Sequence, residues 1–153
     1  LSGAFNRLKI NEEMKKWTEY SKRYNSDFSI AILDFDDFKR INDNYGHLVG
    51  DKVIVEFVSL INKNIRKTDV FARWGGEEFI LLLPNTNISQ AVDLAERIRM
   101  SIEKHDFHVP GNITCSIGVA QMSADDDEQS VMKKVDNLLY TAKKEGKNKV
   151  MWL

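Results

Sequence analysis

Two adjacent carboxylates follow two adjacent glycines in the segment RWGGEEF, residues 73–79. The glycines are Gly75 and Gly76, the acids are Glu77 and Glu78, and apolar stretches lie on both sides. A tight turn between two strands needs a glycine and little else. Neighbouring carboxylates at a strand edge repel each other unless a positive charge lies beside them. The pattern therefore predicts a turn that holds a ligand.

A third acid, Asp34, lies near the end of the apolar run FSIAILDF at residues 28–35. Functional groups commonly lie at strand ends in an open sheet. In a polymerase-palm arrangement this strand lies beside the hairpin, and Asp34 faces Glu77 and Glu78. With a backbone carbonyl such as that of Phe35, the three carboxylates form an all-oxygen site suited to magnesium that bridges phosphates. Taken singly, Asp34 has a simpler role as a helix cap, and the glutamates as solvated turn residues.

Two further pairs of polar residues could contact a nucleotide. Lys143 and Lys147 are four residues apart at the end of an expected helix, share a face and can pair with phosphates. Lysines at a helix C-terminus also complement the helix dipole, which is the reading that spacing alone favours. Asn42 and Asp51 flank a loop at Gly46, and an aspartate can accept hydrogen bonds from guanine N1 and its 2-amino group. Solvated loop residues are the simpler alternative for this pair.

The elements that must position these residues alternate between helix and strand. Helices are expected at residues 8–24, at 36–45 up to Gly46, after Gly50, at 88–105 and at 131–146, and strands at 28–35, 70–73, 79–83, 113–121 and 149–153. The central strands form a hairpin around WGGE. This order predicts an α+β fold with a mixed central sheet and helices on its faces. It contains the βαββαβ core of ferredoxin-like and polymerase-palm folds.

Length and composition indicate one globular domain and exclude several classes of protein. The 153 residues can bury a real core, and the net charge of -1 argues against a nucleic-acid binder. No apolar run is long enough to cross a membrane, and no signal peptide opens the chain. The single cysteine, Cys115, excludes an internal disulfide framework and fits a reducing compartment. We expect a cytoplasmic domain that itself makes no membrane contact.

The segment RWGGEEF resembles the signature of the GGDEF family, the diguanylate cyclases, in its GGEEF form. LSGAFNR resembles the opening LTGLxNR of that family, and LDFDDFKRINDNYGHLVGD resembles its first strand, helix and loop. ITCSIGVA and YTAKKEGKN resemble its later blocks, so the resemblance spans the chain. We expect residues 1–153 to be a single GGDEF-type domain. Because the chain lacks a starting methionine, we expect it to be part of a longer protein with an N-terminal regulatory region. If the full-length protein is tethered to a membrane, we expect that region to provide the tether.

The resemblance implies that two GTP molecules condense into cyclic di-GMP with release of two pyrophosphates. One chain supplies one nucleotide site, so catalysis requires a homodimer. The implied cofactor is Mg2+ or Mn2+, two ions per active site. Asp34, the Phe35 carbonyl and Glu77 are the implied ligands, and Glu78 is a further ligand or assists deprotonation of the attacking hydroxyl. Asp34, Glu77 and Glu78 are thus the implied catalytic residues.

The resemblance also assigns residues to GTP and to the product. Those assigned to GTP are Gly75 and Gly76, which admit the nucleotide, Asn42 and Asp51, which read guanine, and Lys143 and Lys147, which hold phosphates. The residue at the position of Lys147 is often arginine in the family. A lysine there replaces bidentate hydrogen bonding with a single point charge. Arg66 and Asp69 resemble the RxxD site at which cyclic di-GMP inhibits, with Arg97 as its secondary arginine. A surface ion pair between Arg66 and Asp69 is the simpler alternative.

Two departures concern the N-terminus: no acid precedes LSG, and Leu8 replaces a common arginine. They affect the expected coupling to an upstream module more than the chemistry. Two alternatives to an active cyclase stay open, a non-catalytic receptor of cyclic di-GMP and a regulatory GTP-binding domain that serves a partner. Receptors of this family usually lose signature acids, whereas Glu77 and Glu78 are intact. His47 is interpreted as a structural residue.

Overall fold

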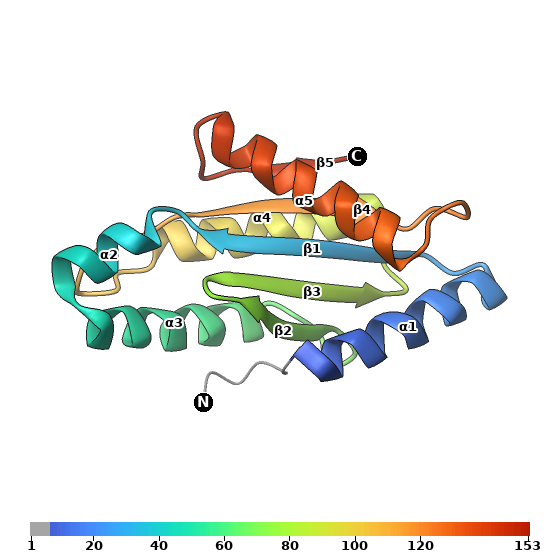
Figure 1. Cartoon of the computed structure of the whole chain (residues 1–153), viewed down its shortest axis with the longest axis horizontal. Helices are drawn as coiled ribbons and strands as arrows, with labels where there is room; N and C mark the ends of the chain where they lie inside the picture. The colour runs from blue at the N-terminus through green and yellow to red at the C-terminus, as the bar shows by residue number, and fades with distance from the viewer. Residues whose placement is uncertain (1–6) are drawn as a thin grey trace.

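The computed structural model describes residues 7–153, so most of the LSGAFNR segment lies outside the described residues. The elements in chain order are α1 (Arg7–Tyr24), β1 (Phe28–Phe35), α2 (Phe38–Tyr45), α3 (His47–Asn62), β2 (Val70–Gly75), β3 (Glu78–Pro84), α4 (Ile88–Lys104), β4 (Cys115–Gln121), α5 (Glu128–Lys144) and β5 (Val150–Trp152). Figure 1 shows that the strands lie between helices. No helix within the described residues is both long and apolar enough to cross a membrane.

The five strands form one mixed sheet in the order β2-β3-β1-β4-β5. β1 lies at its centre, antiparallel to both β3 and β4, and β2 and β3 form the hairpin that carries the signature. β4 and β5 are parallel. The predicted fold class is confirmed, because β1, α2, α3, β2, β3, α4 and β4 form the βαββαβ core.

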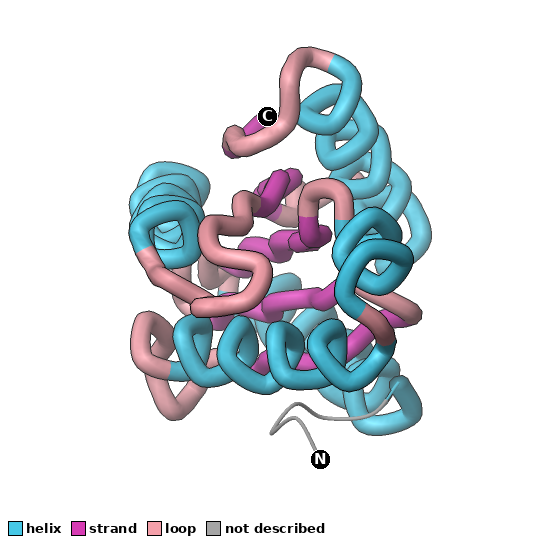
Figure 2. The backbone as a smooth tube through the Cα atoms, turned by 90° about the vertical axis from the view of Figure 1, so that its left-hand side faces the viewer, coloured by secondary structure: helices cyan, strands magenta, loops and turns pink. Residues whose placement is uncertain are grey.

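Both faces of the sheet are covered, which explains why β1 reads as a continuous apolar run. Alternate side chains such as Leu33 pack against α2, α3 and α4, while those such as Ile32 pack against α1 and α5. Figure 2 shows the strands between these helical layers. Within β1, only Asp34 is not fully buried. By its register, Asp34 belongs to the face that α1 and α5 cover.

Two helices begin three or more residues earlier than the sequence predicts. α3 begins at His47, directly after Gly46, so Gly50 lies inside the helix instead of before it. Gly46 has φ +86 and alone makes the break between α2 and α3. α5 begins at Glu128 because Asp127 caps it with a capping box, three residues before the predicted start.

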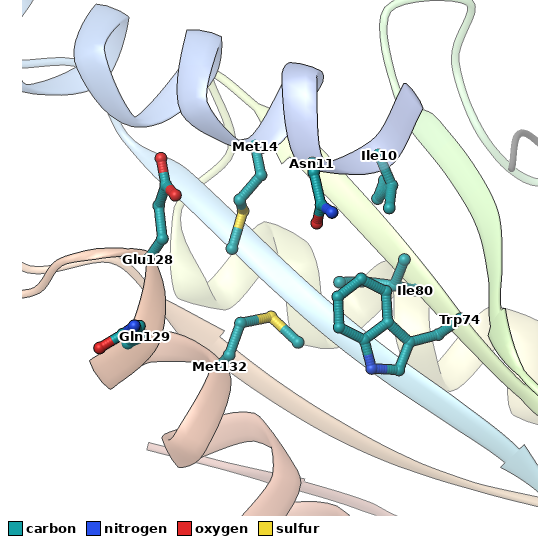
Figure 3. Close-up of a pocket in the computed structure, with 8 residues that line it drawn as sticks. All are labelled: Ile10, Asn11, Met14, Trp74, Ile80, Glu128, Gln129 and Met132. Carbon is teal, nitrogen blue, oxygen red and sulfur yellow. The ribbon is translucent and has the colours of Figure 1, made fainter. Parts of the chain in front are cut away.

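An apolar hollow of about 210 Å³ lies between α1 and α5. Figure 3 shows Met14 and Met132 facing each other across it, with the indole of Trp74 beside them. Trp74 directly precedes the signature glycines, and the Arg7 guanidinium lies 4.1 Å from the centre of its ring. On this face the signature turn is therefore backed by α1 through an arginine–aromatic contact.

Candidate active site

The register of the sheet places Asp34 on β1 directly opposite Glu78 on β3. Glu77 precedes Glu78 in the turn. Burial raises the pKa of Asp34 to about 7; Lys143 opposes this rise, and the charges of Glu77 and Glu78 add to it. Burial also raises the pKa of Glu78, with Asp136 and Glu77 contributing. Three carboxylates thus share one partly buried region, in which Lys143 offsets only part of the rise in the pKa of Asp34.

Asp34 is not the cap of the next helix. The residue before α2 is Asp37, and its side chain makes no capping hydrogen bond. Asp34 Oδ1 is instead buried without a hydrogen-bond partner among the described residues. A buried carboxylate oxygen with no donor is unfavourable in a purely structural residue, so the atom is free for a ligand.

Lys143 reaches the site from α5. Its Nζ donates to the Phe35 carbonyl at 2.5 Å and to Asp36 Oδ1 at 2.9 Å, and lies 3.4 Å from Asp34 Oδ2. The ammonium therefore contacts two of the three predicted metal ligands, Asp34 and the Phe35 carbonyl. It supplies the positive charge that a metal ion would supply there.

Lys147 does not share a helix face with Lys143, so that prediction is wrong. α5 ends at Lys144, Gly146 follows with φ +116, and Lys147 itself has φ +65. The sharp change in chain direction brings Lys147 Nζ to 2.6 Å from Asp37 Oδ1. Both lysines nevertheless reach the loop between β1 and α2.

The donor atoms near Asp34 fit a divalent cation, although they are not assembled around one. Within residues 7–153, no three Asp, Glu, His or Cys side chains already form a metal-binding group. The unpartnered Asp34 Oδ1 and the adjacent Phe35 carbonyl are hard oxygen ligands of the kind that Mg2+ and Mn2+ prefer. Burial is the main cause of the raised pKa of Asp34, and a cation at this carboxylate would lower that pKa as Lys143 does.

An open cleft of about 510 Å³ lies beside the signature turn. Its lining includes Asn42 from α2, Asp51 from α3, and Gly76 and Glu77 from the turn. Ideal Cβ atoms at Gly75 and Gly76 meet no atom within 4 Å, so both glycines face open space. The structure thus brings the predicted guanine-reading pair next to the predicted catalytic turn.

Several residues of this cleft are absent from the sequence prediction. Arg73 lines it, and its Nε donates to the Gly76 carbonyl at 2.7 Å, which braces the turn. His47, interpreted as structural, is exposed and lines the same cleft. Gly50 permits the position of Asn42, because a Cβ there would lie 2.0 Å from Asn42 Oδ1. Arg73 adjoins the signature and was detectable, whereas the role of Gly50 depends on how α2 and α3 pack.

Asp36 is a further residue that sequence reasoning missed. It is buried, and burial alone would raise the pKa of its carboxyl. Hydrogen bonds from Thr114, Ser116 and Lys143 more than offset that cost and lower the pKa below its ordinary value. Its partners are far away in the chain, so no local motif marks it.

The residues of the predicted product site lie at the opposite end of the β2–β3 hairpin from the signature turn. Arg66 Nη2 contacts Asp69 Oδ1 at 3.3 Å, the Pro84 carbonyl at 3.2 Å and Thr86 Oγ1 at 2.5 Å. The Arg66 side chain is 58% exposed, whereas that of Asp69 is 1% exposed. The ion pair that sequence analysis kept as an alternative is therefore present, and more than half of the Arg66 side chain still faces solvent.

Arg97 belongs to the same end of the molecule as Arg66. Its Nη2 donates to the carbonyl of Asn64, two residues before Arg66, at 3.3 Å. The two arginines thus come from α4 and from the segment before β2, and both are exposed.

Comparison with known proteins places the chain in a family. The family model described as "Diguanylate cyclase, GGDEF domain" matches residues 1–149. Diguanylate cyclase DgcM of Escherichia coli is 43% identical over 125 residues, which are 82% of this chain and 30% of that protein. Diguanylate cyclase DgcP of Pseudomonas aeruginosa is 38% identical over 153 residues, 98% of this chain and 23% of that protein. The chain thus spans less than half of either relative.

Solved structures agree with this assignment. The active GGEEF domain of a diguanylate cyclase from Vibrio cholerae has a TM-score of 0.92 at 34% identity, with 96% of each chain covered. The GGDEF domain of DgcB from Caulobacter crescentus in complex with c-di-GMP has a TM-score of 0.93 at 29% identity, and 99% of this chain and 92% of that chain are covered. Because the family model matches nearly the whole length of this chain, the chain belongs to the GGDEF family.

Proposed function

We propose that residues 1–153 are a single diguanylate cyclase domain that condenses two GTP molecules into cyclic di-GMP and two pyrophosphates. The observation that carries this proposal is the cleft beside the signature turn, which gathers Asn42, Asp51, Gly76 and Glu77 from separate segments. The names of the relatives DgcM and DgcP support the same activity. We place the reaction in the cytoplasm, where GTP is made and used.

In this proposal the cleft binds guanosine. Asp51 accepts hydrogen bonds from guanine N1 and its 2-amino group, and Asn42 pairs with the remaining edge of the base. Gly75 and Gly76 admit the ribose and phosphates, since no protein atom fills the space where their Cβ atoms would lie. Arg73 keeps the turn in place through the Gly76 carbonyl.

The phosphates lie toward the loop between β1 and α2. Lys143 contacts Phe35 at the end of β1 and Asp36 in that loop, and Lys147 contacts Asp37, so both ammonium groups are close to where a triphosphate would lie in this proposal. Each lysine is a compact charge without the fork of an arginine.

Asp34, the Phe35 carbonyl and Glu77 would hold Mg2+ or Mn2+, two ions per active site. Bound there, such ions would supply positive charge that offsets the triphosphate and favours deprotonation of the attacking hydroxyl. Glu78 lies opposite Asp34 and has a raised pKa, which suits it to accept the proton of that hydroxyl or to serve as a further ligand.

Two chains must face each other for the chemistry to occur. The 3′-oxygen of one GTP forms a bond to the α-phosphorus of the other. The bond between that phosphorus and the oxygen that bridges the α- and β-phosphates breaks. Pyrophosphate leaves with the electron pair, and the same exchange at the second α-phosphorus closes the ring. Because one chain offers one such cleft, the active species is a homodimer with two-fold symmetry.

Product control is a second part of the proposal. Arg66, Asp69 and Arg97 form a site for cyclic di-GMP, supported by the exposure of both guanidinium groups. The buried Asp69 must open from its contact with Arg66 before it can accept from guanine N–H groups. The DgcB domain is a relative whose structure contains c-di-GMP.

Turnover of GTP tests the function directly. The purified chain is incubated with GTP and Mg2+ at several protein concentrations, and the product is identified by chromatography and mass spectrometry. A dimeric enzyme gives a rate per chain that rises with concentration, and Glu77→Gln serves as the inactive control. A chain that binds cyclic di-GMP or GTP but forms no product at any concentration is instead a non-catalytic regulatory domain.

A further inference from the structure

Asp36 is buried, with 5% of the residue exposed, and each oxygen of its carboxylate accepts two hydrogen bonds. Oδ1 accepts from Ser116 Oγ at 2.7 Å and from Lys143 Nζ at 2.9 Å. Oδ2 accepts from Thr114 Oγ1 at 2.7 Å and from the backbone N–H of Asn148 at 2.9 Å. A carboxylate with all these donors is fixed in one orientation, and so are the groups that donate to it.

Lys143 is the donor that connects Asp36 with the site of the chemistry. The other oxygens near its ammonium are the Phe35 carbonyl and Asp34 Oδ2. A metal ion held by the Phe35 carbonyl and the unpartnered Asp34 Oδ1 would compete with the ammonium for the carbonyl and would repel it from the Asp34 carboxylate, because both are cations. Asp36 is therefore the partner that Lys143 keeps when the site is loaded.

We propose that Asp36 is a positioning residue that holds the Lys143 ammonium where it meets the phosphates of GTP. The inference rests on the proposed role of Lys143, and Asp36 itself touches neither metal nor nucleotide. A purely structural Asp36 would only tie β4 to the loop before β5 through Thr114, Ser116 and Asn148. The two roles differ in one respect: a positioning residue acts through Lys143 and loses its effect on binding once Lys143 is gone.

A double-mutant cycle on nucleotide binding separates these roles. Calorimetry measures the affinity of Asp36→Asn, Lys143→Met and the double variant for the α,β-methylene analogue of GTP in Mg2+. Loss of a charge-assisted contact should weaken binding by about tenfold in each single variant. The double variant should bind no more weakly than Lys143→Met. Thr114→Val, which removes a donor from the other oxygen of Asp36, should stay within about twofold of wild type.

Effects that multiply in the double variant, to about a hundredfold, would overturn the proposal, and so would unchanged affinity in Asp36→Asn. Circular dichroism and urea unfolding establish that each variant is folded. If Asp36→Asn does not fold, Asp36→Glu replaces it, since this variant keeps the charge but displaces it by one methylene and must move Lys143. Unchanged affinity in Asp36→Glu, or failure of both variants to fold, would also show that Asp36 acts on the fold and not on Lys143.

The analogue cannot react at its α-phosphate, so the cycle is independent of turnover. A wild type that binds the analogue but makes no cyclic di-GMP refutes the proposed function and leaves the cycle readable. A wild type that makes cyclic di-GMP, with independent effects of the two substitutions, refutes only the role of Asp36.

Discussion

Replacement of Asp34 with asparagine is expected to stabilise the fold while it stops product formation. In the folded protein the pKa of Asp34 rises from 3.8 to about 7, mainly because the carboxylate is buried and further because Glu77 and Glu78 lie near it. A rise of about three units at about 1.4 kcal/mol per unit gives an upper limit of about 4 kcal/mol for the cost of its charge. Partial solvent exposure screens that cost, so roughly 2 kcal/mol is the expected gain in the free energy of unfolding.

The gain should depend on pH in a defined direction. Below the unfolded pKa of 3.8 the carboxyl is protonated in both states and costs nothing. Between that value and about 7 the folded protein retains a proton that the unfolded chain releases, so the free energy of unfolding falls as pH rises. Above about 7 the full penalty is present in wild type and absent from the asparagine variant.

Urea unfolding without metal, at intervals from about pH 5 to about pH 8, measures this difference. Asp37→Asn is the matched control, because Asp37 is an exposed neighbour that contacts Lys147. The reasoning is refuted if Asp34→Asn is less stable than wild type at about pH 8, or if its advantage is the same across the range. Turnover by Asp34→Asn should fall by about a hundredfold or more.

The other substitutions address the base, the cleft and the product site. Asp51→Ala should reduce the preference for GTP over ATP by about tenfold or more, because a site built on hydrogen bonds rejects a mismatched base. If ATP competes with GTP equally well in wild type and in the variant, Asp51 does not read the base. Gly50→Ala should weaken GTP binding by displacing the Asn42 side chain, which a Cβ would approach to 2.0 Å, and unchanged affinity would remove Asn42 from the site. Arg66→Ala should weaken cyclic di-GMP binding, relieve an inhibition of about 1–3 kcal/mol and preserve the initial rate. The same variant should lose about 1 kcal/mol of the free energy of unfolding, because contacts such as that to Thr86 are removed. If calorimetry gives the same affinity for cyclic di-GMP in wild type and in Arg66→Ala, Arg66 has only a structural role.

The strands, and the approach of Asp34 to the signature acids, could be predicted from local patterns in the sequence. A continuous apolar run at residues 28–35 indicates a strand buried on both faces, and the diglycine between apolar stretches indicates a hairpin. Once these strands are adjacent, their register decides which residues meet. The expectation that Asp34 faces the signature acids is confirmed for Glu78, which pairs with it across the sheet.

Features that depend on chain reversals and on distant partners were not predictable. Lys147 was placed on the helix by its spacing, but Gly146 ends the regular path and turns the chain. Gly50 looks like a helix breaker, whereas it is a point of close approach to Asn42. Asp36 is one of several acids in DFDDFK, and only the arrival of donors from residues 114, 116, 143 and 148 distinguishes it.

The arrangement of charge around Asp34 has a consequence for how the proposed enzyme would take up its cation. Lys143 contacts both Asp34 and Asp36, so in the absence of metal it offsets part of the repulsion among the signature acids. If a metal ion took the place of the ammonium at Asp34, Lys143 would keep its contact with Asp36, and neither charge would be buried without a partner. Metal binding would then exchange one cation for another at Asp34 instead of adding charge to an empty site. Lys143, still held by Asp36, would then have its remaining N–H donors available for the phosphates, so metal binding would favour phosphate binding at the same site.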